Sequence, residues 1–270
     1  MDQIKTLSMN NAYVTFINTD DYLPGVLALK KSLDRFNCEN DFVILTVKKS
    51  LSNEAIKMLK SINCKLKTVG EIMNPSMNGE NKGCFNHYTK LRVFEMKEYD
   101  KIIFLDADLI ILEDIAPLFE APHMSAVAAG SLIPENNWVD LNGGFLVIEP
   151  SGQLFDEMHR ASGYLPSKDG TDQGFLHSFY TDWPIKKHLH LDHRFNVPLQ
   201  YLETYCERFG YRFSYVNEML DTNIAVLHYW GPLKPWMIHH ESGLLDNSLR
   251  VKEAVNLWWD FYEAAFKEVK

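Results

Sequence analysis

Two aspartates stand one residue apart directly after an apolar segment: Asp106 and Asp108 follow Lys101–Leu105. In near-extended chain, residues i and i+2 project to the same side. Both carboxylates would then point to one place, where they repel each other unless a cation lies between them. A divalent metal supplies that cation, and carboxylate oxygens suit Mn²⁺ or Mg²⁺. The pair by itself is more often a plain loop with two solvated aspartates.

A histidine, a glycine and a lysine stand close together later in the chain, at His228, Gly231 and Lys234. A lone histidine in the predicted strand Val226–Tyr229 is more often structural than a ligand. The two neighbours change this interpretation, because glycine allows close backbone approach and lysine is a point cation that suits phosphate oxygens. The group fits a metal-diphosphate site, and an imidazole ligand favours Mn²⁺ over Mg²⁺.

Two further segments carry groups that hydrogen-bond well to sugar hydroxyls. The first is Leu141–Phe145, with an amide and two glycines before a predicted strand. The second is Asp169–Gly174, with two carboxylates, a hydroxyl and an amide before a predicted helix. Either segment is also compatible with an ordinary turn, the second with Thr171 or Asp172 capping the helix.

The composition narrows the function classes. With 270 residues, 46% of them hydrophobic, the chain can bury one sizeable core. The net charge of -9 argues against a nucleic-acid surface, which needs clustered Lys and Arg. A phosphoryl-transfer enzyme or nuclease that uses the same carboxylates is disfavoured by this acidic balance and by the lack of a GxxxxGK[ST] loop.

The expected location is cytoplasmic. The N-terminal residues do not resemble a signal peptide, and no apolar run approaches the roughly 20 residues that span a membrane. The four cysteines (Cys38, Cys64, Cys84 and Cys206) form no CxxC pair, so free thiols in a reducing compartment are predicted.

The first half of the chain alternates strand-like and helix-like segments. Strands are predicted at Tyr13–Ile17, Phe42–Val47, Lys65–Val69 and Lys101–Leu105, helices at Leu23–Phe36, Asn53–Ser61 and His87–Glu98, and a loop at Asn74–Phe85. This order predicts an α/β fold with a mostly parallel sheet. Ligands bind beyond the carboxyl ends of such strands, where Asn18–Asp20 and Asp106–Asp108 both fall.

The second half is less regular. Strands are predicted at Ala126–Ala129, Gly144–Ile148 and Val226–Tyr229, helices at Gln153–Ala161, Gln173–Phe179 and Leu249–Val269, and a loop at Pro134–Asn142. The chain shows no internal repeat and no linker. We therefore predict one domain over residues 1–270, with a nucleotide-binding half to about residue 110 and a sugar and acceptor half from about 111 to 270.

Taken in order, these segments resemble glycosyltransferase family 8, and within it the glycogenin-like members. The matching segments are Val14–Tyr22, Tyr88–Leu91, Phe104–Asp108, Asn142–Gly144, Asp172–Gly174, His228–Trp236 and Trp258–Asp260. No single motif is decisive, but the ordered set is specific. The resemblance implies the GT-A fold, a Rossmann-like nucleotide-sugar-binding α/β domain, and retaining transfer from a UDP-sugar.

The resemblance also implies three groups of site residues. Mn²⁺ would be bound by Asp106, Asp108 and His228. UDP would be held by Phe16, Asn18, Thr19, Tyr22, Ala107, Gly231 and Lys234. The donor sugar would be surrounded by Lys90, Asp106, Asn142, Gly143, Asp169, Asp172 and Gln173, of which Lys90, Asp172 and Gln173 would act in catalysis.

The expected chemistry follows from the charges. The metal and Lys234 would stabilise the negative charge on leaving UDP. An oxygen of Asp172 or Gln173 would stabilise the oxocarbenium-like centre. We favour a front-face reaction, in which the leaving phosphate takes the proton of the acceptor, over a covalent intermediate; the sequence leaves both open.

The donor and acceptor are less defined. A hexose is expected, with glucose favoured and galactose kept open because galactinol synthases share the architecture. The acceptor would be a separate glycan, lipid or polyol, because Tyr201 and Tyr205 do not align cleanly with the tyrosine that glycogenin glucosylates. A catalytically idle UDP-sugar-binding module is the other alternative. The resemblance also leaves a homodimer open.

Overall fold

The central element is a six-stranded sheet of order β3-β2-β1-β4-β7-β6. The computed structural model describes residues 9–36, 39–74, 87–128, 139–231, 234–238 and 248–269. The strands are β1 (Asn11–Phe16), β2 (Asp41–Val47), β3 (Lys65–Val69), β4 (Lys101–Leu105), β6 (Ser125–Ala128) and β7 (Leu141–Ile148). Pairing is parallel from β3 to β4, and β7 is antiparallel to both of its neighbours, β4 and β6. The predicted α/β class with a mostly parallel sheet is confirmed.

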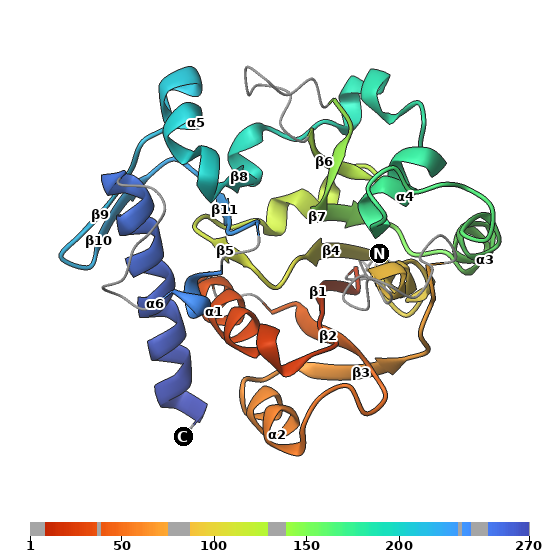
Figure 1. The fold of residues 1–270 in the computed structure, drawn as a ribbon, viewed down its shortest axis with the longest axis horizontal. Helices are drawn as coiled ribbons and strands as arrows, with labels where there is room; N and C mark the ends of the chain where they lie inside the picture. Colours follow the sequence, from red (N-terminus) through yellow and green to blue (C-terminus); the bar gives the residue numbers. More distant parts are fainter. Residues whose placement is uncertain are drawn as a thin grey trace, which may run out of the picture.

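Helices cover both faces of this sheet (Figure 1). One layer contains α1 (Leu23–Asp34), α2 (Asn53–Ser61) and the 3₁₀ helix η4 (Ala116–Glu120). The other contains the 3₁₀ helix η3 (His87–Glu95), α3 (Gly152–Ala161) and α4 (Asp172–Phe179). Side chains of successive strand residues point to opposite faces of the sheet and so pack against the two layers in turn. Tyr13 and Ile103 pack with α1, whereas Val14 and Phe104 pack with η3.

A small second sheet lies beside the first, with order β5-β11-β8. It joins β5 (Leu109–Ile111), β11 (Val226–His228) and β8 (Val197–Pro198). A third part of the core surrounds it, built from α5 (Leu202–Phe209), the hairpin of β9 (Phe213–Val216) and β10 (Met219–Thr222), and the long helix α6 (Leu249–Val269). Helix α6 packs along α1 at the edge of the molecule (Figure 1).

Short 3₁₀ helices make up the remaining regular structure of the described residues. They are η1 (Asp20–Tyr22), η5 (Trp183–Ile185), η6 (Lys187–Leu189), η7 (His193–Phe195), η8 (Leu199–Tyr201) and η9 (Pro235–Met237). Within the described ranges, no helix combines the length and the apolar character needed to cross a membrane.

Several elements differ from those predicted. The segment predicted as a helix over His87–Glu98 is a 3₁₀ helix that ends at Glu95, in keeping with its β-branched and aromatic residues, which lose rotamer freedom in an α-helix. The predicted loop Pro134–Asn142 overlaps β7, which begins at Leu141; its residues 134–138 lie outside the described ranges. The predicted loop Asn74–Phe85 also lies outside them, except for Asn74.

Candidate active site

The small sheet brings together three segments that are far apart in the sequence. In its register His228 lies opposite Leu109 on one side and Pro198 on the other. The Tyr229 N–H donates to the carbonyl oxygen of Asp108 over 2.9 Å, which extends the ladder by one residue. Asp108 and Asn196, which flank Leu109 and Val197 in the chain, are therefore placed next to the His228 imidazole.

The two aspartates lie in a tight turn between β4 and β5. The Asp106 N–H continues the main sheet by donating to the Gly144 carbonyl oxygen over 2.8 Å, and the Leu109 N–H donates back to the Asp106 carbonyl oxygen over 3.2 Å. The near-extended geometry predicted for this segment is therefore wrong. The chain has to turn here because β5 leaves the main sheet to pair with β11.

Asp106, Asp108 and His228 form the candidate metal centre. One ligand atom from each lies within 4.8 Å of the others. His228 Nε2 is 3.3 Å from Asp108 Oδ1, and Lys234 Nζ is 2.5 Å from Asp108 Oδ2. Burial raises the pKa of Asp108, but His228 and Lys234 lower it more, so this pKa lies well below its usual range. Asp108 is therefore an ionised carboxylate, as a divalent cation requires.

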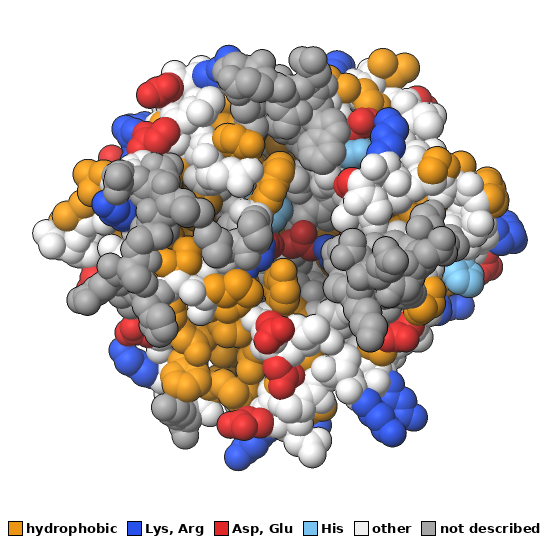
Figure 2. Space-filling model, viewed as in Figure 1, with side chains coloured by type: hydrophobic (Ala, Val, Ile, Leu, Met, Phe, Trp, Pro, Cys, Tyr) orange, Lys and Arg blue, Asp and Glu red, His pale blue; other side chains and the backbone are white. Residues whose placement is uncertain are grey.

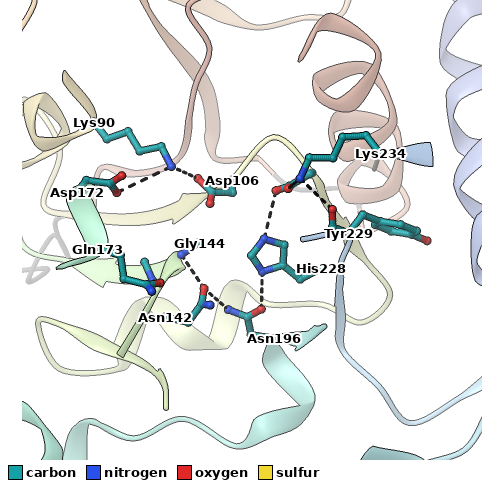
Figure 3. A network of polar contacts seen from close by, with 12 residues as sticks. Lys90, Asp106, Asn142, Gly144, Asp172, Gln173, Asn196, His228, Tyr229 and Lys234 are labelled. Atoms are coloured by element: carbon teal, nitrogen blue, oxygen red, sulfur yellow. Dashed lines mark hydrogen bonds and ion pairs between the residues drawn. The ribbon is translucent and has the colours of Figure 1, made fainter. Parts of the chain in front are cut away.

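Lys90 lies on the side of the site opposite Lys234, where it pairs with Asp106 and Asp172. Its Nζ is 2.7 Å from Asp106 Oδ1 and 3.9 Å from Asp172 Oδ2 (Figure 3). Burial lowers the pKa of Lys90, but the two carboxylates raise it more, and the net pKa lies above its usual range. A permanently charged ammonium group therefore bridges the aspartate turn and the start of α4.

These groups border one polar cavity of about 350 Å³, within the usual range for ligand sites. Figure 2 shows it as the hollow near the centre of the face, where acidic, basic and histidine side chains gather. The predicted site residues that line it are Tyr22, Lys90, Asp106, Asp108, Asn142, Gly143, Asp169, Asp172, Gln173, His228, Gly231 and Lys234. Gly144, Thr171 and Trp230 also line it, although they were not among the predicted site residues.

Four residues predicted to hold UDP do not line the cavity. Phe16 is buried among the residues that pack with η3, and Ala107 is buried beneath α1, where its carbonyl oxygen closely approaches Gly25. Asn18 and Thr19 follow β1 at its carboxyl end, the edge that also carries Asp106. The contacts of these four residues with uridine stay predictions.

Asp169 organises the loop that precedes α4. Its Oδ1 accepts hydrogen bonds from the Thr171 N–H (2.8 Å), the Thr171 hydroxyl (2.9 Å), the Ser167 hydroxyl (3.0 Å) and the Gly174 N–H (3.1 Å). The capping role considered for Thr171 or Asp172 thus belongs to Asp169, because the Thr171 side chain makes no cap hydrogen bond. The loop places Asp172 and Gln173 at the cavity wall.

Replacing Gly174 by Ala should disrupt this loop. An added Cβ would lie 2.2 Å from Asp169 Oδ1 and 2.5 Å from the Ser167 hydroxyl oxygen. We expect a loss of stability of about 1–3 kcal/mol, measured by thermal or denaturant unfolding. Gly152→Ala is the control, since nothing lies within 4 Å of its Cβ. Equal stability of the two variants would contradict this account.

Asn196 and Trp230 are the main residues of the site that sequence reasoning missed. Asn196 is buried, and its Oδ1 lies 2.8 Å from Nδ1 of His228. Trp230 is part of the His228–Trp236 segment, and its ring centroid is 6.1 Å from that of His228. The signal for Trp230 was its place two residues after a candidate ligand. Asn196 carried no comparable signal in the sequence.

A solved structure of an active-site mutant of LgtC has the same fold. It covers 94% of this chain and 95% of its own length, with a TM-score of 0.61 and 15% identity. The chain therefore has the GT-A fold that the sequence predicted. Residues 13–139 match the model of Glycosyl transferase family 8. The match agrees with the family that the sequence resembles.

Named relatives agree with this assignment. The putative UDP-glucuronate:xylan alpha-glucuronosyltransferase 5 of Arabidopsis thaliana is 30% identical over 265 residues, which cover 96% of this chain and 43% of the plant protein. Glycogenin-1 of Oryctolagus cuniculus is 27% identical over 271 residues, which cover 94% of this chain and 75% of glycogenin-1. The chain thus spans less than half the length of the plant relative.

Proposed function

We propose that this chain is a Mn²⁺-dependent, retaining hexosyltransferase that moves glucose from UDP-glucose to a hydroxyl acceptor. The observation that carries the proposal is the position of two carboxylates and an imidazole at one cavity that also contains Asp172 and Lys90. The proposal is tested against two alternatives. In one the donor is UDP-galactose, and in the other the protein binds a UDP-sugar without turnover.

The residues present fit a manganese ion. Two carboxylate oxygens and an imidazole nitrogen form a mixed donor set, which suits Mn²⁺ better than Mg²⁺. When bound, such an ion would supply positive charge to the diphosphate leaving group. Lys234, which lines the same cavity beside Asp108, would hold the diphosphate oxygens as a second cation.

The lysines of the cavity favour a neutral sugar. Among the described residues that line it, Lys90 pairs with Asp106 and Asp172, and Lys234 pairs with Asp108. Lys234 is assigned to the diphosphate, and Lys90 already faces two carboxylates of the protein. The carboxylate of a glucuronate donor, as named for the plant relative, would have to compete for these cations, whereas the hydroxyls of glucose would not.

Asp172 is the better of the two candidates for stabilising the anomeric centre. The Gln173 Oε1 accepts the Gly143 N–H over 2.9 Å, so its NH₂ group is the one that it can offer to a sugar hydroxyl. In the front-face reaction, the bond from the anomeric carbon to the phosphate oxygen breaks. The acceptor oxygen forms the new bond on the same face, and its proton passes to the leaving phosphate.

A donor panel tests this function. The full chain is incubated with UDP-glucose, UDP-galactose or UDP-glucuronate, with and without Mn²⁺, and thermal stabilisation and UDP release are measured. We expect metal-dependent UDP release, greatest with UDP-glucose. Preference for another sugar would correct the donor, tight binding without release would indicate an idle module, and no response to any donor would refute the proposal.

The acceptor is expected to contact Trp230. This side chain is partly exposed, lines the cavity beside His228, and is braced by Tyr201 at 6.3 Å between ring centroids and an interplanar angle of 82°. A flat aromatic surface next to the metal centre fits the C–H face of a pyranose, so we propose a glycan acceptor.

Trp230→Ala should raise the acceptor KM about tenfold in a panel of disaccharides. UDP release by hydrolysis should stay unchanged, and Trp230→Phe should keep most of the affinity; equal weakening of UDP binding would contradict this role.

Four broader predictions belong to the same proposal. Residues 1–270 act as one domain, with the nucleotide half ending near residue 110. Tyr205 is not a self-glycosylation site, which its burial supports, and mass spectrometry after incubation with UDP-glucose tests this. The protein is cytoplasmic, which the free thiols of Cys64 and Cys206 support. A homodimer stays a prediction for sedimentation to test.

A further inference from the structure

Two buried asparagines connect the backbone at the cavity wall to the candidate ligand His228 (Figure 3). The Gly144 N–H donates to Asn142 Oδ1 over 2.9 Å. The Asn196 Nδ2 donates to the same oxygen over 2.9 Å, and Asn196 Oδ1 lies 2.8 Å from His228 Nδ1. Asn142, Asn196 and His228 are 5%, 3% and 4% exposed, so these hydrogen bonds are shielded from water.

The backbone fixes the direction of every hydrogen bond in this chain of contacts. The Gly144 N–H can only donate, so the atom of Asn142 that it meets is the side-chain oxygen. That oxygen can only accept, so Asn196 has to turn its NH₂ group toward it and its own oxygen toward His228. His228 Nδ1 must then carry the ring proton, which leaves the lone pair on Nε2.

The Nε2 atom is the one that faces the candidate metal centre. It lies 3.3 Å from Asp108 Oδ1, so the two atoms share a cation: a second ring proton in the metal-free protein, or a metal ion in its place. Histidines that bind metals commonly donate their other ring N–H to a fixed acceptor, which sets both the tautomer and the orientation of the ring.

We propose that Asn196 is a positioning residue: with Asn142 and the Gly144 backbone, it fixes His228 in the Nδ1–H tautomer and presents Nε2 to Mn²⁺. The inference rests on the metal site of the proposed transferase. It has a second consequence, because Asn142 Oδ1 already accepts two hydrogen bonds. Asn142 therefore offers its NH₂ group to the donor sugar, and the sugar contact and the metal ligand share one support.

Asn196→Ala tests the proposal without any measurement of sugar transfer. The variant and the wild-type chain are titrated with Mn²⁺ alone, and free Mn²⁺ is followed by electron paramagnetic resonance. We expect the affinity to fall about 10- to 100-fold. Long-range ¹⁵N–¹H NMR of the metal-free protein, at a pH high enough for the ring to be neutral, should show the Nδ1–H tautomer of His228 in the wild type and a mixture in the variant. The His228 signals are assigned by their loss in His228→Gln.

Asn196→Asp separates positioning from a general structural role. An aspartate keeps an oxygen that accepts the His228 Nδ1–H, so its Mn²⁺ affinity should exceed that of Asn196→Ala. If Asn196 only filled space, the buried charge would make the aspartate the worse of the two. Ser32→Ala is the control, because it removes a buried hydroxyl that accepts the Ile111 N–H elsewhere in the core, and it should leave Mn²⁺ affinity unchanged.

The outcomes distinguish this inference from the transferase proposal. Wild-type Mn²⁺ affinity in Asn196→Ala, an Nε2–H tautomer in the wild type, or no Mn²⁺ binding by the wild type would each overturn it. Weaker Mn²⁺ binding in Asn196→Ala, together with no UDP release from any donor, would support the positioning role and refute only the proposed reaction.

Discussion

Asp108→Asn should lower UDP release on the order of 10³-fold, the loss expected when one charge-stabilising group is removed from a catalytic site. The substitution removes an ionised ligand from between His228 and Lys234. Mn²⁺ affinity should fall by at least the roughly 10- to 100-fold that removal of an outer-shell partner costs. Initial rates of UDP release at several Mn²⁺ concentrations measure both effects.

Asparagine is a better replacement than alanine, because Lys234 is buried. Its Nζ contacts the Tyr229 carbonyl oxygen at 3.0 Å besides Asp108, and an alanine would leave a buried ammonium group with that one polar partner among those described here. An amide oxygen can still accept from Lys234. Because Lys90 and Lys234 are paired to the two aspartates, the loss of one carboxylate does not simply relieve repulsion between them. We expect a small loss of stability.

Asp114→Asn is the matched control for this prediction. It makes the same substitution six residues further along the chain, at an exposed side chain that caps the Ala116 N–H rather than lining the cavity. Its rate and Mn²⁺ dependence should equal those of the wild type. Wild-type UDP release by Asp108→Asn, with its melting temperature preserved, would show that the metal assignment is wrong.

The main sheet could be predicted because its elements carry strong local signals. The segments Phe42–Val47 and Lys101–Leu105 are continuous apolar runs, and the intervening helices have clear spacing and caps, such as Ser52 at the start of α2. The candidate ligands could be predicted for a different reason. Their order along the chain matched a family, and that order does not depend on the local conformation of each segment.

The small sheet that assembles the site could not be predicted in the same way. Its strands β5, β11 and β8 have three, three and two residues, which is too short for any periodicity to appear. The pairing of β11 with β5 joins residues far apart in the chain, such as Val226 with Ile111, and β8 pairs with the same strand from a third segment. The neighbourhood of His228 and Asn196 is set by that pairing, so the positioning role of Asn196 became visible only in three dimensions.

Gly144→Ala should weaken Mn²⁺ binding about 10- to 100-fold although it adds one methyl group to a strand. The added Cβ would lie 2.6 Å from His228 Cε1, 3.0 Å from Asp106 Oδ2 and 3.1 Å from Asn142 Oδ1. Real Cβ atoms essentially never approach another heavy atom to 2.6 Å, so the imidazole has to move. Movement of the ring takes Nε2 away from the two carboxylates and strains its hydrogen bond to Asn196.

Gly143→Ala supplies the matched control, one residue earlier in the same strand. Its Cβ would meet the Gln173 Cβ at 3.4 Å, an ordinary van der Waals contact. Because β7 pairs with both β4 and β6, a general intolerance of the strand to side chains would affect both variants alike. We therefore expect Gly143→Ala to keep the Mn²⁺ affinity of the wild type, measured by the same titration, even if its donor affinity changes.

Two outcomes would contradict this prediction. If both variants bound Mn²⁺ as the wild type does, His228 would not be a ligand in the position that the structure gives it. If both lost binding equally, the strand rather than the imidazole would be the sensitive element.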